Sequence, residues 1–216
     1  MRSPLHLVRR YFHRQNYSKG YLSKLTGFIE NTKYPIFFYI IAANIGIYSL
    51  HQIGLLSSKL MYNFFTFKPR NFELINSLSY SFNNQSLIGL TITMAPFFLL
   101  AKRIEPLFGA RHVMGLYLAG AFGGAMSRSL FTRRSDIEMT GSMPSVLSLS
   151  VFNLLNFAQS NFLFFGLRLT KRNLLILTLV LLVLSGLSGD KGAGFSGVAG
   201  GVAAGVAYRY LLRRSF

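Results

Sequence analysis

Residues 81–130 read SFNNQSLIGLTITMAPFFLLAKRIEPLFGARHVMGLYLAGAFGGAMSRSL, and this stretch decides the fold. It holds two long apolar runs, separated by a short connection that carries charges from Lys102 to Arg111. A membrane-crossing helix needs about 20 apolar residues, or about 17 when flanking Lys and Arg side chains reach back to the interface. The stretch therefore predicts two consecutive membrane helices.

The whole chain of 216 residues continues this pattern. Apolar residues make up 51% of it and the mean hydropathy is +0.38, which is too high for a soluble domain. Six long intervals contain no ionised side chain, and the helices expected in them cover approximately 34–56, 87–101, 112–129, 142–157, 173–187 and 193–212. We predict an all-α fold, a polytopic six-helix membrane domain over residues 34–212, with a basic arm at 1–33 and a basic tail at 213–216.

The composition also excludes several classes of function. The net charge of +17 would suggest nucleic acid in a soluble chain, but the charges lie between apolar segments and no basic groove with interleaved aromatics is present. Cysteine is absent, and His6, His13, His51 and His112 share no spacing that places two ligands on one helical face. We therefore expect no nucleic-acid partner, no metal site and no cofactor.

The arm at 1–33 has the chemistry of a mitochondrial targeting segment. Six basic residues, Arg2, Arg9, Arg10, Arg14, Lys19 and Lys24, precede the first acidic residue, Glu30. A secretory signal would need an apolar stretch directly after the first charges, and none occurs before Tyr34. The alternative is a basic arm of a bacterial or endoplasmic-reticulum protein held at anionic lipid. Whether the arm is cleaved stays open.

One connection and two segments have further local signals. The connection 57–86 spaces aromatics through polar residues, which predicts an interfacial loop with short amphipathic helices. The third and sixth segments are rich in glycine, which predicts close helix packing in lipid. These glycines are Gly115, Gly120, Gly123, Gly124, Gly194, Gly197, Gly200, Gly201 and Gly205.

From about Phe72 to Leu212 the chain resembles the rhomboid intramembrane proteases. The framework positions of that family are held here by Phe82, Gly89, Leu90, Thr93, Glu105, Gly109 and Tyr117, followed by the segments GSMPSVLSLS and GFSGVAGGVAAG. The resemblance implies packing roles for Glu105, Gly109, Gly141, Gly200, Gly201 and Gly205. We further expect Glu105 to pair with Lys102, Arg103 or Arg111.

The catalytic positions implied by the resemblance are all replaced. The nucleophilic serine position is Met143, whose thioether cannot attack a carbonyl, and the histidine position of the sixth helix is Val198. Gly89 and Thr93 stand where the oxyanion His and Asn would be, and losing one such donor typically costs about 10²–10³ in rate. The chain is therefore expected to be a pseudoprotease with no catalytic residues.

A displaced catalytic pair is the remote alternative. Ser142 or Ser145 would need a general base within hydrogen-bonding reach, and no histidine follows His112. Lys191 is the one candidate base, but it lies beside Asp190 in a short connection. An active intramembrane serine protease is therefore a remote alternative, which requires Lys191 to act as the base for Ser142 or Ser145.

The expected function is that of a non-catalytic accessory or structural subunit of a mitochondrial inner-membrane complex, with a respiratory-chain assembly as the first expectation. The alternative is a component of a protein-translocation or client-handling machinery, like the import translocase or the derlins. Expected partners are other membrane subunits of a large complex and anionic lipids such as cardiolipin.

The distribution of positive charge predicts that both termini face the matrix. The opposite connections hold only a minority of the basic residues, namely Lys59, Lys68, Arg70, Arg128, Arg133, Arg134 and Lys191.

Overall fold

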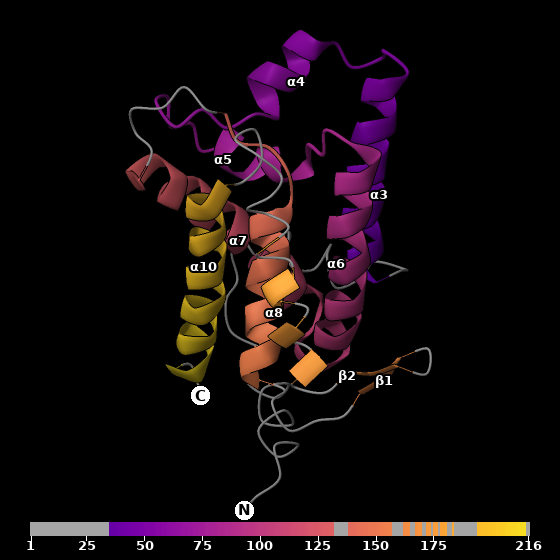
Figure 1. Ribbon diagram of the computed structural model, residues 1–216, viewed down its shortest axis with the longest axis vertical. Coiled ribbons are helices and arrows are strands. Elements are labelled where there is room, and N and C mark those ends of the chain that lie inside the picture. The colour runs from indigo at the N-terminus through magenta and orange to yellow at the C-terminus, as the bar shows by residue number, and fades with distance from the viewer. Residues whose placement is uncertain are drawn as a thin grey trace, which may run out of the picture.

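The computed structural model describes residues 35–131, 138–156, 162–164, 167–169 and 194–214, together with single positions between 172 and 183. Its long helices stand side by side as a bundle (Figure 1). They are α3 (Ile36–Gln52), α6 (Leu87–Phe108), α7 (Ala110–Phe131), α8 (Met143–Asn156) and α10 (Gly194–Arg214). This arrangement confirms the predicted helical bundle. The basic arm and most of the fifth predicted segment lie outside the described residues, although the described positions between 172 and 183 are helical.

The helix boundaries differ from the predicted ones at several ends. Helix α6 runs on to Phe108 through Pro96 and Pro106, and Gly109, with φ of 89°, forms the turn into α7. Helix α3 ends at Gln52, shortly before Gly54, which also has a positive φ of 79°. A positive φ is readily adopted only by glycine. Both helices therefore end beside a glycine with a left-handed backbone conformation, and not at the nearest charged residue.

The helices differ in length and in mean hydropathy. Within the described part of the chain, α6 alone is both long and apolar enough to cross a membrane by composition, while α3 and α8 are apolar but shorter. Polar side chains such as His112 and Arg128 lower the mean hydropathy of α7.

A short pair of strands accompanies the helical bundle, and the sequence analysis did not predict it. Strands β1 (Phe162–Phe164) and β2 (Leu167–Leu169) pair in antiparallel register, with Leu163 opposite Arg168. The sequence here is rich in phenylalanine, and aromatic residues favour extended backbone.

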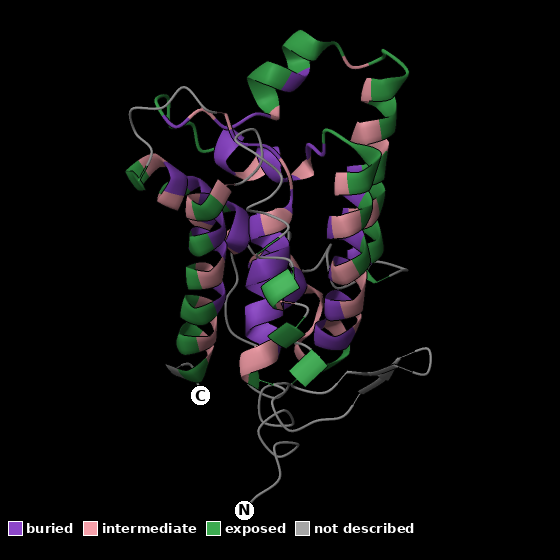
Figure 2. Ribbon diagram, in the orientation of Figure 1, coloured by how far each residue is buried: buried purple, intermediate pink, exposed green. Residues whose placement is uncertain are grey.

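Helix α8 lies at the centre of the bundle. Every residue from Pro144 to Asn153 is buried, whereas α3 and α10 each expose one face (Figure 2). Helices α6, α7 and α10 all pack against α8. The central position explains why α8 is buried on all sides, because neighbouring helices cover each of its faces.

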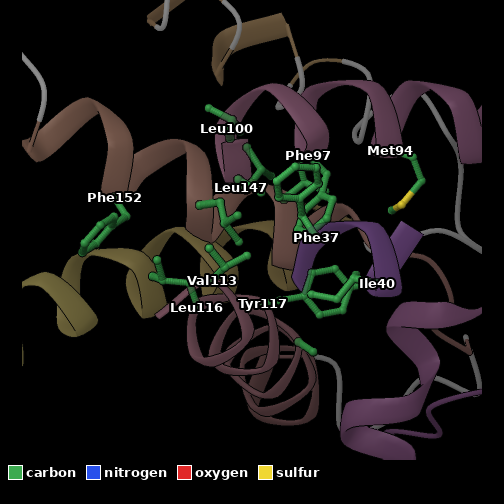
Figure 3. Packing of buried hydrophobic residues seen from close by; sticks show 14 of the residues in the cluster. Phe37, Ile40, Met94, Phe97, Leu100, Val113, Leu116, Tyr117, Leu147 and Phe152 are labelled. Carbon is green, nitrogen blue, oxygen red and sulfur yellow. The ribbon is translucent and has the colours of Figure 1, made fainter. Parts of the chain in front are cut away.

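Aromatic and aliphatic side chains fill the space between α3, α6 and α7. Phe37, Ile40, Phe97 and Tyr117 gather there (Figure 3), and the rings of Phe97 and Tyr117 meet edge to face with centroids 5.4 Å apart. Edge-to-face pairs are favoured because the positive ring edge meets the negative ring face.

The connection between α3 and α6 contains α4 (Ser58–Phe64), α5 (Asn76–Ser79) and the 3₁₀ turn η1 (Tyr80–Phe82). Phe67 is fully buried and exchanges two backbone hydrogen bonds with Met139, just before α8. The buried Tyr80 hydroxyl donates to the carbonyl of Ala121 in α7, 2.8 Å away. Burial, and to a lesser extent Tyr117, raises the pKa of Tyr80 well above its usual value. The predicted short helices are therefore present and anchored to the bundle.

Glycine permits the close approach of α7, α8 and α10. A methyl group added to Gly205 would lie 2.6 Å from the carbonyl oxygen of Ser148, and one added to Gly120 would lie 2.7 Å from Cα of Ser145. On the α7 side, a methyl group at Gly123 would lie 2.7 Å from the carbonyl oxygen of Gly200. Such backbone contact replaces the missing hydrophobic driving force between helices in lipid. At these three glycines the neighbouring backbone therefore leaves no room for a larger side chain.

Candidate functional site

The positions at which the resemblance expects the catalytic groups lie on α8 and on the helices packed against it. Thr93 lies in the second turn of α6, Met143 begins α8, and Val198 lies in α10. The hydroxyls of Thr93 and Ser142 each lie 3.4 Å from Asn84 Oδ1, which places the start of α8 beside α6. Gly201, one turn after Val198, packs against Pro144. The fold thus brings Thr93, Met143 and the α10 segment into one region.

The side chains at positions 143 and 198, where the resemblance expects the nucleophile and the base, are apolar. Val198 is 1% exposed and belongs to the hydrophobic core, and Met143 is half-buried and packs against the same core. Pro144 follows Met143 and has no backbone N–H to offer to an oxyanion. Neither side chain can accept a proton from a hydroxyl, so this arrangement supplies no nucleophile, base or oxyanion donor at these positions.

Gly89 and Thr93, where the resemblance expects the oxyanion donors, form local hydrogen bonds at the start of α6. The Gly89 N–H donates to Ser86 Oγ, 3.0 Å away, and this bond caps the start of α6. The Thr93 hydroxyl lies 2.9 Å from the carbonyl of Gly89 and 3.1 Å from that of Leu90. Hydroxyls in apolar helices commonly bond to a carbonyl one turn back in this way.

A buried polar network spans the region, and the sequence did not predict it. Asn84 Nδ2 donates to Asn44 Oδ1 at 2.9 Å, and Asn44 Nδ2 donates to the Tyr117 hydroxyl at 3.2 Å and to the Ile40 carbonyl at 2.9 Å. The Tyr117 hydroxyl donates in turn to the carbonyl of Ser81. Asn44 is the one signal that could have revealed the network, because an Asn in the middle of an apolar segment needs partners.

This network ties together elements that are distant in sequence. It connects α3 through Asn44, the connection before α6 through Ser81 and Asn84, and α7 through Tyr117. Through Asn84 Oδ1 it reaches Ser142 at the start of α8. All its members are buried, so water does not reach these polar groups. Each hydrogen bond in the network therefore takes the place of one that the group would otherwise make to water.

The serines considered for a displaced catalytic pair have no base near them among the described residues. Ser142 and Ser145 are fully buried, and Ser145 Oγ has no hydrogen-bond partner in that part of the chain. His112 contacts the Tyr208 hydroxyl at 3.0 Å. Because Ser145 packs at Gly120, His112 lies two turns away along α7, about 12 Å at 1.5 Å per residue. Lys191 lies outside the described residues.

Several other polar side chains inside the bundle bond to nearby backbone or bridge two helices. Ser148 Oγ donates to the Leu116 carbonyl at 2.7 Å, and the Ser150 and Thr178 hydroxyls lie 2.6 Å apart. Thr91, Asn153 and Asn156 donate to carbonyls in the preceding turn of their own helices. Within the described residues, no group of three His, Asp or Glu side chains could hold a metal.

Glu105 has different partners from the predicted cations. Its Oε1 accepts from the backbone N–H of Ile36 at 2.7 Å, and its Oε2 accepts from Phe37 at 3.4 Å. The carboxylate therefore caps the first turn of α3, whose free N–H groups and positive dipole favour an anion. Gly109 and Gly141, the neighbouring predicted packing residues, have φ of 89° and 99° and form the turns before α7 and α8.

We expect substitution of Glu105 to loosen α3. Glu105→Ala removes both acceptors from the α3 amides and is expected to lower the free energy of unfolding by about 2 kcal/mol, as for other charged hydrogen bonds. Glu105→Gln keeps one acceptor and should lose about half as much. Denaturant titration in mixed micelles measures both. An alanine variant as stable as the unmodified protein would show that the cap contributes nothing.

Two comparisons with known proteins were informative to different degrees, and one of them identifies the family. A search of curated proteins found no match to the chain. The family model described as the Rhomboid domain matches residues 71–215, which is more than half of the chain and contains the whole region around Thr93, Met143 and Val198. The chain therefore belongs to the rhomboid family of membrane proteins.

Proposed function

We propose that this rhomboid-like protein is catalytically inactive and serves as an accessory subunit of a mitochondrial inner-membrane complex, such as a respiratory-chain assembly. The observation that carries the proposal is the state of the former catalytic region. Met143 and Val198 pack with the hydrophobic core, and the polar groups around them are engaged in a network that joins helices. The region holds the bundle together in place of supporting hydrolysis.

The retained packing supports a role for the folded block itself. Gly120, Gly123 and Gly205 still bring α7, α8 and α10 into backbone contact. A protein that had lost its function would not need this helix packing. The packing therefore favours a function that depends on the folded bundle. A compact membrane block without catalysis fits a structural subunit.

The surface of the connection between α3 and α6 supports contact with a partner or an interface. Tyr62, Phe64, Leu74 and Ile75 are between 46% and 70% exposed. Large apolar side chains that cluster on a surface mark contact with protein or membrane. The mitochondrial location rests on the basic, acid-poor arm at 1–33, which lies outside the described residues.

Restoring the two decisive side chains should not restore hydrolysis. Met143→Ser combined with Val198→His rebuilds a nucleophile and a base, but leaves Gly89, Thr93 and Pro144 without oxyanion donors. We expect no cleavage of a transmembrane substrate above background, since the missing donors alone cost about 10²–10³ in rate each. The assay follows cleavage in liposomes beside an active rhomboid. Turnover by the double variant would contradict the loss of oxyanion stabilisation inferred for this region.

The subunit proposal is tested by purification of the tagged full-length protein from its own membranes in mild detergent. We expect migration with a large complex on a native gel, with the same partner subunits identified by mass spectrometry in repeated preparations. Deletion of residues 1–33 should abolish that association, while neutralising Lys59 and Lys68 should not. Migration as a free monomer, unchanged by the deletion, would reject the proposal and favour a client-handling role.

A further inference from the structure

Helices α3 and α6 are short compared with the thickness of a bilayer. They run antiparallel, because the Glu105 carboxylate near the end of α6 accepts hydrogen bonds from the amides at the start of α3. Their other ends, Gln52 in α3 and Leu87 in α6, are joined by the connection 53–86 at the upper end of the bundle (Figure 1). At 1.5 Å per residue α3 is about 26 Å long, whereas the hydrocarbon core is about 30 Å thick.

Charged side chains near the end of α6 mark the lower edge of the hydrocarbon, since ionised groups avoid it. These are Lys102 and Glu105. From Lys102 back to Leu87 the helix rises about 22 Å, and from Glu105 about 27 Å. The hydrocarbon core therefore continues about 3 to 8 Å beyond the start of α6. The residues that follow α3 and precede α6 accordingly lie at membrane depth and not in water.

The upper end of the bundle presents the apolar surface that this depth requires. Large apolar side chains of the connection and of the first turn of α6 are between 62% and 73% exposed, and α4 is mostly green in Figure 2. Those side chains are Ile53, Leu55, Leu74, Ile75, Leu87 and Ile88. Exposed apolar area of this extent marks contact with lipid or protein.

Helix α4 has the pattern of a helix that lies in the membrane interface. Met61 is buried and faces the bundle. Lys59 and Asn63 are exposed, and each is two residues from Met61, which is about 200° around a helix, so both lie opposite Met61. Leu60 and Phe64 are exposed one turn apart along one flank. The polar side thus points away from the bundle, and the apolar flank lies between the two, in the plane of the membrane.

The charge of the connection 53–86 complements anionic lipid headgroups. Its basic residues are Lys59, Lys68 and Arg70, and its one acidic residue is Glu73. The Glu73 carboxylate accepts a hydrogen bond from Asn76 Nδ2 at 2.9 Å. A net positive charge next to apolar side chains is the combination that attracts a segment to the surface of an anionic membrane.

We propose that helix α4 and the connection around it bind the interfacial layer of the bilayer, with Leu60 and Phe64 among the upper acyl chains and Lys59 among the headgroups. A protein that covers the same surface is the competing outcome of the test. The proposal needs only the membrane fold, and it does not depend on the accessory-subunit role.

The test measures the depth of single side chains in the full-length protein, reconstituted alone into vesicles of phosphatidylcholine and phosphatidylglycerol. The chain has no cysteine, so Leu60→Cys, Phe64→Cys, Lys59→Cys and Asn63→Cys can each carry one nitroxide spin label. Electron paramagnetic resonance then gives the collision rates with oxygen, which dissolves in hydrocarbon, and with a water-soluble nickel chelate. Ile45→Cys, at an exposed position in the middle of α3, is the reference for lipid contact.

We expect the ratio of oxygen to nickel collisions at Leu60→Cys and Phe64→Cys to lie near that of Ile45→Cys, and several-fold above that of Lys59→Cys and Asn63→Cys. All these positions are exposed, so helix content by circular dichroism should equal that of the unmodified protein. Equal ratios at the four α4 positions would place the apolar flank in water and overturn the proposal. Low collision rates with both reagents at Leu60→Cys and Phe64→Cys would show that protein covers the flank, and would overturn it as well.

Discussion

Replacing Gly200 by leucine is expected to separate α7 from α10 and to unfold a large share of the protein at moderate denaturant. Even a methyl group at this position would lie against the Gly123 carbonyl and 2.6 Å from Cβ of Ser127. Backbone cannot move aside as a flexible side chain can, so the two helices must shift apart. We expect a loss of about 3 kcal/mol or more in the free energy of unfolding, at the upper end for overpacking.

The measurement is a denaturant titration in mixed micelles, followed by far-ultraviolet circular dichroism. Ala203→Leu is the matched control, because Ala203 lies in the same helix on its exposed face and gains the same side chain. The control should change the free energy of unfolding by no more than about 0.5 kcal/mol. A Gly200→Leu protein as stable as the control would show that α7 and α10 are not in close contact.

Removal of Asn84 is expected to have the second largest effect. Asn84→Leu leaves Asn44 Oδ1 without its donor and Ser142 Oγ without its acceptor, both in a buried site. Each unpaired buried group costs about 1–3 kcal/mol, so we expect a loss of about 3 kcal/mol in the free energy of unfolding. Gln85→Leu, at the exposed neighbouring position, is the control and should have little effect.

A double-mutant cycle tests whether the two asparagines act as a unit. If they do, Asn44→Leu combined with Asn84→Leu will cost clearly less than the sum of the single changes, because the second change removes a group that the first left unpaired. Strict additivity would show that the hydrogen bond between Asn44 and Asn84 contributes little to stability.

The fold could be predicted from the sequence because its signals are local. Charge-free intervals locate the helices, and the glycines of the third and sixth segments indicate where helices approach closely. The expectation that Met143 and Val198 carry no catalytic chemistry is equally local, since it depends on side-chain type at two positions. The structure adds that both side chains pack with the core.

The long-range partners could not be predicted from the sequence. Asn44 and Asn84 are far apart in the chain, and nothing in either segment specifies the other. Glu105 has three basic residues nearby in sequence, yet it binds the amides at the start of α3, because a helix start offers donors that only the folded arrangement brings close. The strand pair at 162–164 and 167–169 lies in a segment too short for a clear periodic pattern.

The proposed absence of hydrolytic activity in this member of the rhomboid family is tested most directly with a reactive probe. The purified full-length protein is treated in liposomes with a fluorophosphonate, beside an active rhomboid, and the adducts are mapped by mass spectrometry. We predict no adduct at Ser142 or Ser145 and no cleavage of a transmembrane substrate. Stoichiometric labelling of either serine, abolished by its replacement with alanine and accompanied by cleavage, would contradict the inactive state.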